Sequence, residues 1–142
     1  MRFDSWAGAV AAENRNWLIT KHVNAIVQGV RKNGHQQPII GFPKGLGDGL
    51  IHYAEESGVD AIGLDHGVDP GWAGKNLPKN LPVQGNLDPL SLISAGKEML
   101  RDIDYILESF HDRPHIFNLG HGIIPPTPVE NVQIMIDHIR NV

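Results

Sequence analysis

The sequence of 142 residues lacks cysteine, an excess of positive charge and any long apolar run. Without cysteine there is no disulfide framework, no thiolate nucleophile and no thiolate zinc site, a composition that suits a reducing compartment. Twelve Lys and Arg against sixteen Asp and Glu give a net charge of −4, which does not attract nucleic acid or an anionic membrane surface. No segment approaches the roughly 18–20 apolar residues of a membrane span, and the N-terminus has no signal-peptide core. We therefore expect a cytoplasmic protein with no nucleic-acid or membrane partner.

Strand and helix patterns alternate along the chain, whose apolar fraction of 41% suffices for a packed core. Short β-branched runs bounded by turn residues predict buried strands at 38–42, 59–64, 81–85 and 115–119. Apolar residues at spacings of three and four predict helices at 13–32, 49–57, 95–110 and 128–140, with a short helix at 70–74. Residues 3–8 are interpreted as the end of a strand that runs into a loop.

This order of elements predicts the α/β fold class, with right-handed βαβ units and a parallel sheet. Four parallel strands would leave two unpaired edges, and no residue pattern protects those edges. A closed (β/α)8 TIM barrel needs about 250 residues. We therefore expect residues 1–142 to form a single partial-barrel segment, half of a barrel with four parallel βα units.

The polar and glycine-rich clusters follow the expected strands, at the edge where parallel α/β sheets bind ligands. Gly120-His121-Gly122 is the sharpest cluster, because its glycines allow close backbone approach and its imidazole can donate, accept or carry charge. Asp65 ends the second expected strand and could pair with a ligand cation or orient His66. A surface turn and a loop cap remain alternative interpretations of these two motifs.

Three further side chains at this edge are candidate ligand groups. Lys44 would supply the cation that an anionic ligand needs at the mouth of a barrel. Asn86 lies within Gln84–Pro89, a segment in which Asp88 is better explained as a helix cap. Ser5 is not part of a GxSxG elbow, so we expect its hydroxyl to hydrogen-bond a ligand rather than to act as a nucleophile.

Two other classes of site are disfavoured by residue spacing. Gly45, Gly47 and Gly49 follow a strand and open a helix, but they lack both the GxGxxG spacing and the P-loop Lys. The remaining histidines show no HExxH or comparable metal spacing, so we expect them to be structural or surface residues and expect no metal site.

Four segments together resemble the uroporphyrinogen decarboxylase family: Phe3–Gly8, Gly63–Asp65, Val83–Pro89 and Phe117–Ile123. They occur in that family's order and at its spacing, and the combination of QGNLDP with NLGHG is highly specific. The resemblance covers essentially the whole chain. It implies that the chain corresponds to the C-terminal half of the family's (β/α)8 barrel.

The resemblance also implies an activity. The family removes the carboxyl groups from the four acetate side chains of uroporphyrinogen, giving coproporphyrinogen in haem biosynthesis, with neither a metal nor an organic cofactor. Its motif histidine falls on His121, as a catalytic proton donor or a clamp for a substrate carboxylate, and its motif serine falls on Ser5. The other residues that we expect to bind substrate are Lys44, Asp65, Asn86, Gly120 and Gly122.

The chain departs from the family pattern in two respects. The family's arginine-rich segment, pyrrole-binding aspartate and catalytic tyrosine precede the first matching segment, so we expect the chain alone to be inactive. It would act as a homodimer, as the family commonly does, or together with a missing N-terminal half. In addition, His66 stands where family members usually carry an aromatic residue.

The sequence is also compatible with two alternative functions. One is a barrel-fold methyltransferase, which the absence of cysteine argues against because those enzymes hold zinc partly through thiolates. The other is a non-catalytic half-barrel that binds a tetrapyrrole.

Overall fold

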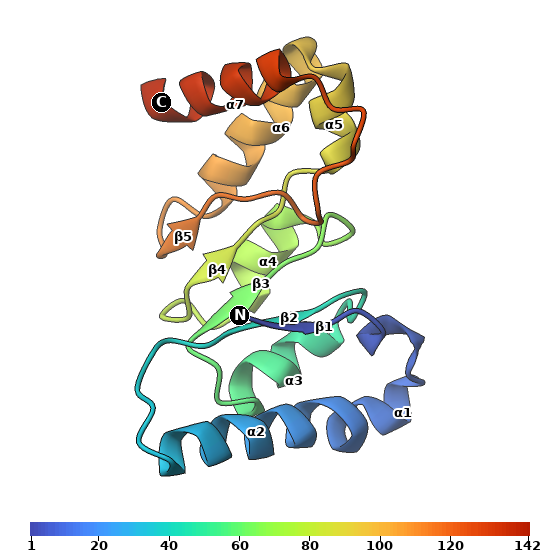
Figure 1. Ribbon diagram of the computed structural model, residues 1–142, viewed down its shortest axis with the longest axis vertical. Helices are drawn as coiled ribbons and strands as arrows, with labels where there is room; N and C mark the ends of the chain where they lie inside the picture. Colours follow the sequence, from blue (N-terminus) through green and yellow to red (C-terminus); the bar gives the residue numbers. More distant parts are fainter.

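Five parallel strands form one sheet in the computed structural model, which describes residues 1–142 (Figure 1). The strands are β1 (Arg2–Asp4), β2 (Ile40–Pro43), β3 (Ala61–Gly63), β4 (Val83–Gln84) and β5 (His115–Ile116). They neighbour one another in chain order, and every neighbouring pair is parallel. The expected α/β class is thus confirmed, although the four expected strands are shorter than the sequence pattern indicated.

The strand end expected at residues 3–8 is Arg2–Asp4, which pairs with β2 along its whole length and gives the sheet one strand more than the four expected. Phe3 lies opposite Phe42, and Asp4 lies opposite Pro43. A strand of three residues is too short to show an apolar periodicity of its own. This strand is defined by its pairing with β2, which depends on the tertiary structure and not on a local sequence pattern.

Helical segments follow every strand. The element order is β1, a 3-10 turn (Ala7–Ala9), α1 (Ala12–Arg15), a π-helical turn (Asn16–Thr20), α2 (Lys21–Lys32), β2, α3 (Gly49–Glu56), β3, α4 (Pro70–Asn76), β4, α5 (Pro89–Ser94), α6 (Gly96–Ser109), β5 and α7 (Val129–Asn141). The separate helix α5 was not expected from periodicity. Asp88 caps it as the sequence suggested, since its Oδ1 accepts a hydrogen bond from the Leu90 N–H at 2.9 Å.

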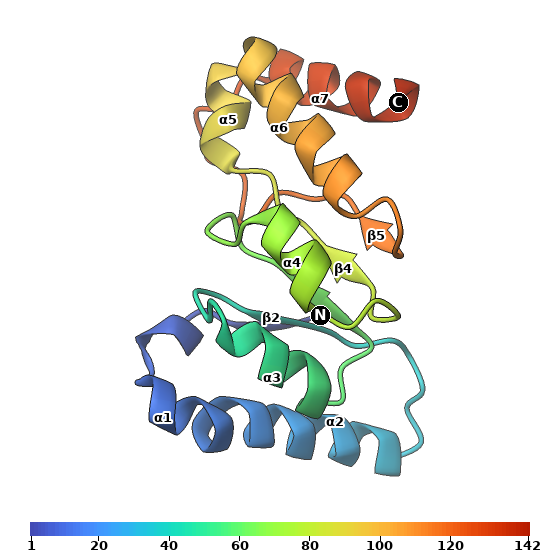
Figure 2. The ribbon, with the colours of Figure 1, turned by 180° about the vertical axis from the view of Figure 1, so that it is seen from behind.

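One face of the sheet is covered by helices. Figure 2 shows α3 and α4 lying across this face. Successive side chains of a strand point to opposite faces, and on the covered face Ile62 and Val83 are completely buried. Tyr53 of α3 approaches Gly41 so closely that a Cβ there would lie 2.3 Å from the tyrosine hydroxyl. The core therefore lies between the sheet and this layer of helices.

The opposite face has no helix over it (Figure 1). Because side chains alternate along each strand, Phe3, Phe42, Gln84 and Ile116 all point to this uncovered face. Phe3 of β1 is 65% exposed and Ile116 of β5 is 48% exposed, so apolar side chains at both edges of the sheet are left open to solvent on this face. In a closed barrel this face would be the interior, so the sheet has the form of an opened barrel wall.

The remaining helices pack at the two ends of the sheet. Helices α5, α6 and α7 contact one another beyond β5, and the π-helical turn before α2 contacts α3 at the β1 end (Figures 1 and 2). Met99 and Ile103 of α6 are completely buried in the same core cluster as Val23 of α2. None of the helices combines the length and the apolarity that crossing a membrane requires.

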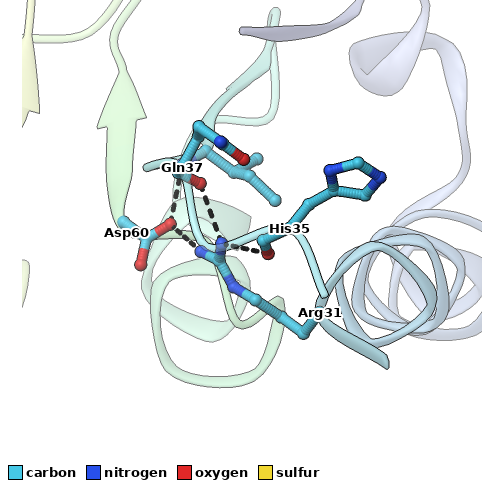
Figure 3. A network of polar contacts seen from close by, with 5 residues as sticks. Arg31, His35, Gln37 and Asp60 are labelled. Atoms are coloured by element: carbon cyan, nitrogen blue, oxygen red, sulfur yellow. Dashed lines mark hydrogen bonds and ion pairs between the residues drawn. The ribbon is translucent and has the colours of Figure 1, made fainter. Parts of the chain in front are cut away.

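A polar network fixes the amino ends of β2 and β3 (Figure 3). The Arg31 guanidinium at the end of α2 pairs with the Asp60 carboxylate and donates to the carbonyl oxygens of His35, at 3.2 Å, and Gln37, at 2.8 Å. Asp60 Oδ2 also accepts the Ile39 N–H at 2.7 Å. The loops at the amino ends of these strands are thus held by their own polar groups.

Candidate functional site

All the candidate residues lie along one edge of the sheet, the edge formed by the carboxyl ends of the strands. Ser5 follows β1, Lys44 follows β2, Asp65 follows β3, Asn86 follows β4, and residues 120–122 come after β5. Because the five strands are parallel, their carboxyl ends meet at the same edge. This is the edge at which barrel and open α/β proteins bind ligands.

A cavity of about 540 Å³ opens at this edge, on the uncovered face. Its wall is apolar and consists of Met1, Phe3, Phe42, Leu64, Leu119 and Ile123. Phe3 and Phe42 pack edge to face there, with ring centroids 5.7 Å apart. Its polar groups are Ser5, Gln84, Asn118 and His121. An apolar wall with a few polar groups suits a flat, largely apolar ligand that carries polar substituents.

The structure brings together three of the expected residues at this cavity, namely Ser5, His121 and Gly122. Gly122 has open space where a Cβ would lie. Gly120 does not line the cavity but has a steric role, since a Cβ there would lie 2.2 Å from the backbone nitrogen of His66. The loop after β5 therefore contacts the loop after β3 at Gly120.

Asp65 is engaged in holding loops together. It is 7% exposed, and its carboxylate accepts the Gly45 N–H at 2.7 Å and the Gly67 N–H at 2.9 Å. Both carboxylate oxygens thus bind backbone groups of the loops after β2 and β3. Asp65 does not line the large cavity, and direct contact with a substrate stays a prediction.

Asn86 has a similar environment. It is 4% exposed, and its amide Nδ2 donates to the carbonyl oxygens of Asp65, at 3.0 Å, and Val68, at 2.7 Å. It lines a separate pocket of about 160 Å³ together with His66 and Tyr105. Its contacts connect the loop after β4 to the loop after β3.

Lys44 is fixed through its backbone, while its side chain pairs with no carboxylate in the structure. Its N–H donates to the Asp4 carbonyl at 3.0 Å, and its carbonyl accepts the Gly8 N–H at 2.9 Å. Gly8 is required for this approach, because a Cβ there would lie 2.6 Å from the Gly45 carbonyl oxygen. The Lys44 ammonium does not line the cavity in this conformation.

Gln84 and Asn118 also line the cavity, although neither was expected at the site. Gln84 could have been found from the alternation of β4, because its neighbour Val83 is completely buried on the covered face. Asn118 follows β5 and bonds locally, with its Oδ1 accepting the Leu119 N–H at 2.8 Å. The apolar wall gave no sequence signal, because its residues come from separate segments. Nowhere do three or more His, Asp or Glu side chains cluster as a metal site would require.

His115 links β5 to the loop that carries Asn86. Its Nε2 lies 2.7 Å from the Gly85 carbonyl oxygen, and its ring packs against that of Phe110, with centroids 4.8 Å apart. Burial lowers the pKa of His115 below its usual value of 6.5, while the hydrogen bond to Gly85 partly opposes that shift. The folded chain therefore holds this imidazole neutral more strongly than the unfolded chain does.

Acidification should consequently destabilise the fold through His115. A lowered pKa in the folded state means that the unfolded state binds more protons, so the free energy of unfolding decreases as the pH falls through about 6.5. We expect His115→Gln to remove part of this dependence. Urea denaturation followed by circular dichroism between about pH 7.5 and 5 measures it. Equal pH slopes for the two proteins would contradict the assignment.

The parallel sheet, with one uncovered face and a cavity at its carboxyl edge, is that of an α/β protein and is consistent with part of a (β/α) barrel. Comparison with known proteins gives the family. The family model for uroporphyrinogen decarboxylase (URO-D) matches residues 1–142. The chain belongs to the uroporphyrinogen decarboxylase family.

Curated relatives named uroporphyrinogen decarboxylase agree with this match. The chain is 53% identical over 139 residues to the protein of Sphingopyxis alaskensis and 50% identical over 139 residues to that of Novosphingobium aromaticivorans, in each case over 97% of this chain. It is 42% identical over 142 residues to the protein of Granulibacter bethesdensis. The chain spans about 40% of the length of these relatives.

Proposed function

We propose that the chain forms the carboxyl-terminal part of a cofactor-free decarboxylase that converts uroporphyrinogen to coproporphyrinogen in the cytoplasm. The observation that carries the proposal is the cavity at the carboxyl edge, which combines an apolar wall with Ser5 and His121. The wall suits the face of a tetrapyrrole ring, and the polar groups suit its carboxylate substituents. The family match over the whole chain supports the same substrate class.

The proposed chemistry makes the substrate its own electron sink. Protonation of a pyrrole ring allows the acetate C–C bond to break, so that CO₂ leaves and the bonding electrons pass into the ring. A proton then adds to the exposed methylene carbon, giving a methyl group, and loss of a ring proton restores the pyrrole. The protein has to hold the ring, stabilise the developing charge and move protons, which are tasks for preorganised polar groups and a general acid.

The residues of this chain divide these tasks among them. His121 lines the cavity and is the proposed proton donor or carboxylate clamp, and Ser5 is the proposed hydrogen-bond donor to a substrate carboxylate. Lys44 is the proposed cation for a second carboxylate, which requires its side chain to turn toward the cavity. Asp65 and Asn86 support the site by holding the loops together.

Turnover should require the rest of a barrel. The sheet ends in two strands with unpaired edges, β1 and β5, so in this structure the cavity is bounded by one wall only. We expect these 142 residues alone to bind coproporphyrin III without decarboxylating uroporphyrinogen under anaerobic conditions. Quenching of the exposed Trp6, next to Ser5, reports binding, and chromatography of the products by carboxyl number reports turnover.

Replacement of His121 should separate specific from non-specific binding. We expect His121→Ala to weaken coproporphyrin binding by roughly 10- to 150-fold, since a charge-assisted hydrogen bond contributes about 1.5–3 kcal/mol. The matched control is His35→Ala, because His35 is an exposed histidine outside the cavity. Equal affinities of the two variants would argue against a role for His121, and turnover by the chain alone would refute its expected inactivity.

The open edges and the exposed apolar face also support a partner, either a second copy of the chain or the remainder of the barrel. Unpaired strand edges favour pairing with another strand, and the exposed Phe3 and Ile116 would gain burial from it. The mass of the chain in solution, from light scattering after gel filtration, tests the first alternative. A stable monomer with the full helix content would count against it.

A further inference from the structure

The imidazole ring of His66 packs against the imidazole ring of His121. The two ring centroids lie 6.4 Å apart, with the ring planes at 88°, an edge-to-face arrangement. His121 lines the large cavity, whereas His66 lines only the separate pocket of about 160 Å³. His66 therefore contacts His121 from outside the cavity, and an effect of His66 on a ligand would pass through the ring of His121.

The backbone that carries His66 is fixed on several sides. The Asp65 carboxylate binds the N–H groups of Gly45 and Gly67, and the Val68 N–H donates to the Asp65 carbonyl at 3.1 Å. The Asn86 amide adds hydrogen bonds to the carbonyl oxygens of Asp65 and Val68. The turn around His66 is thus a rigid support.

The loop that carries His121 is fixed one residue earlier. The Gly120 N–H donates to the Leu87 carbonyl at 2.8 Å, and Gly120 packs on the backbone of His66 with no room for a Cβ. The exposed imidazole of His121, in contrast, makes no hydrogen bond or ion pair within the chain. Contact with the ring of His66 is the one aromatic contact that restrains it.

We propose that His66 is a positioning residue, which holds the imidazole of His121 toward the cavity by edge-to-face packing. The proposal rests on the proposed role of His121. Aromatic rings favour this geometry because the positive edge of one ring meets the negative face of the other. Because the contact depends on ring shape, another flat ring at position 66 should replace it, whereas a methyl group should not.

The variants His66→Ala and His66→Phe test this in the 142-residue chain. Imidazole NMR signals of His121, assigned with His121→Ala, report the orientation and order of the ring. In His66→Ala we expect these signals to move toward those of a freely rotating histidine and coproporphyrin III binding to weaken roughly 2- to 10-fold, the range of an aromatic pair. In His66→Phe we expect an ordered His121 ring and affinity within about 2-fold of the original chain.

Two results would overturn the proposal. One is an unchanged His121 signal in His66→Ala while circular dichroism shows the same fold. The other is a disordered His121 ring in His66→Phe, which would mean that the imidazole nitrogens of His66, and not its shape, make the contact. If the original chain fails to bind coproporphyrin at all, the binding expected of this part of the barrel fails, and the NMR signals still decide the role of His66.

Discussion

Gly120→Ala should be the most damaging single-atom change at the site. A Cβ at this position would lie 2.2 Å from the backbone nitrogen of His66 and 2.7 Å from its Cα. Because the clash involves backbone on a turn that Asp65 and Asn86 hold, neither side can yield easily. We expect the free energy of unfolding to fall by about 2–3 kcal/mol and coproporphyrin binding to weaken by roughly 10-fold.

Gly122→Ala is the matched control for this change. No atom lies within 4 Å of the position that its Cβ would take, so we expect its stability to stay within about 0.5 kcal/mol of the original. Urea denaturation of both variants gives the comparison. Equal stabilities would show that the loop after β5 moves freely, against the packing described for Gly120.

Asp65→Ala should have the second large effect, and it should act on stability. The change removes the acceptor of the Gly45 and Gly67 N–H groups, which bind the Asp65 carboxylate at 2.7 and 2.9 Å. Leaving a buried donor unpaired costs about 1–3 kcal/mol, and since both of these donors are only partly buried we expect a loss of about 2–4 kcal/mol, in the lower part of the summed range. Against a typical stability of about 5–15 kcal/mol, this is a large fraction. Thermal or urea denaturation measures it.

Two further variants complete the comparison: Asp65→Asn, which keeps part of the hydrogen bonding, and Asp48→Ala, which is the control for removing an exposed carboxylate. The carboxamide introduced by the first variant keeps one acceptor oxygen and places an NH₂ group against the other backbone donor, so we expect an intermediate loss. Asp48 lies in the adjoining loop with its side chain 91% exposed, and we expect its removal to cost at most about 0.5 kcal/mol. If Asp65→Ala keeps its stability and loses only ligand binding, Asp65 contacts the ligand directly and its structural role is secondary.

The sequence predicted the fold class because its signals are local. β-branched runs, turn residues and helical periodicity lie within single segments, and their alternation permits few arrangements other than a parallel sheet. The first strand was expected only as a strand end at residues 3–8 and was not counted in the sheet, because Arg2–Asp4 is too short to show such a local pattern and is defined by its pairing with β2. Helix α5 was not predicted for a similar reason, since its six residues are too few to show a helical periodicity of apolar residues.

The candidate site was predicted in outline and differs in detail. That Ser5, Asp65, Asn86 and His121 lie at one edge follows from their positions after parallel strands. Which of these residues face the cavity depends on the conformation of each loop. The sequence pattern does not specify that conformation. Asp65 and Asn86 turn toward backbone groups of neighbouring loops, whereas His121 turns toward the cavity.

By itself, the sequence determined the alternation of strands and helices, the edge at which polar residues gather, and the family motifs. Tertiary structure alone decided that Asn118 lines the cavity, that Gly120 packs on His66, and that the rings of His66 and His121 meet. The physical reason is that the residues that meet lie far apart along the chain, where no local sequence pattern can relate them. Residues 66 and 121 come together only when hydrogen bonds through β4 and its loop hold the intervening segments in register.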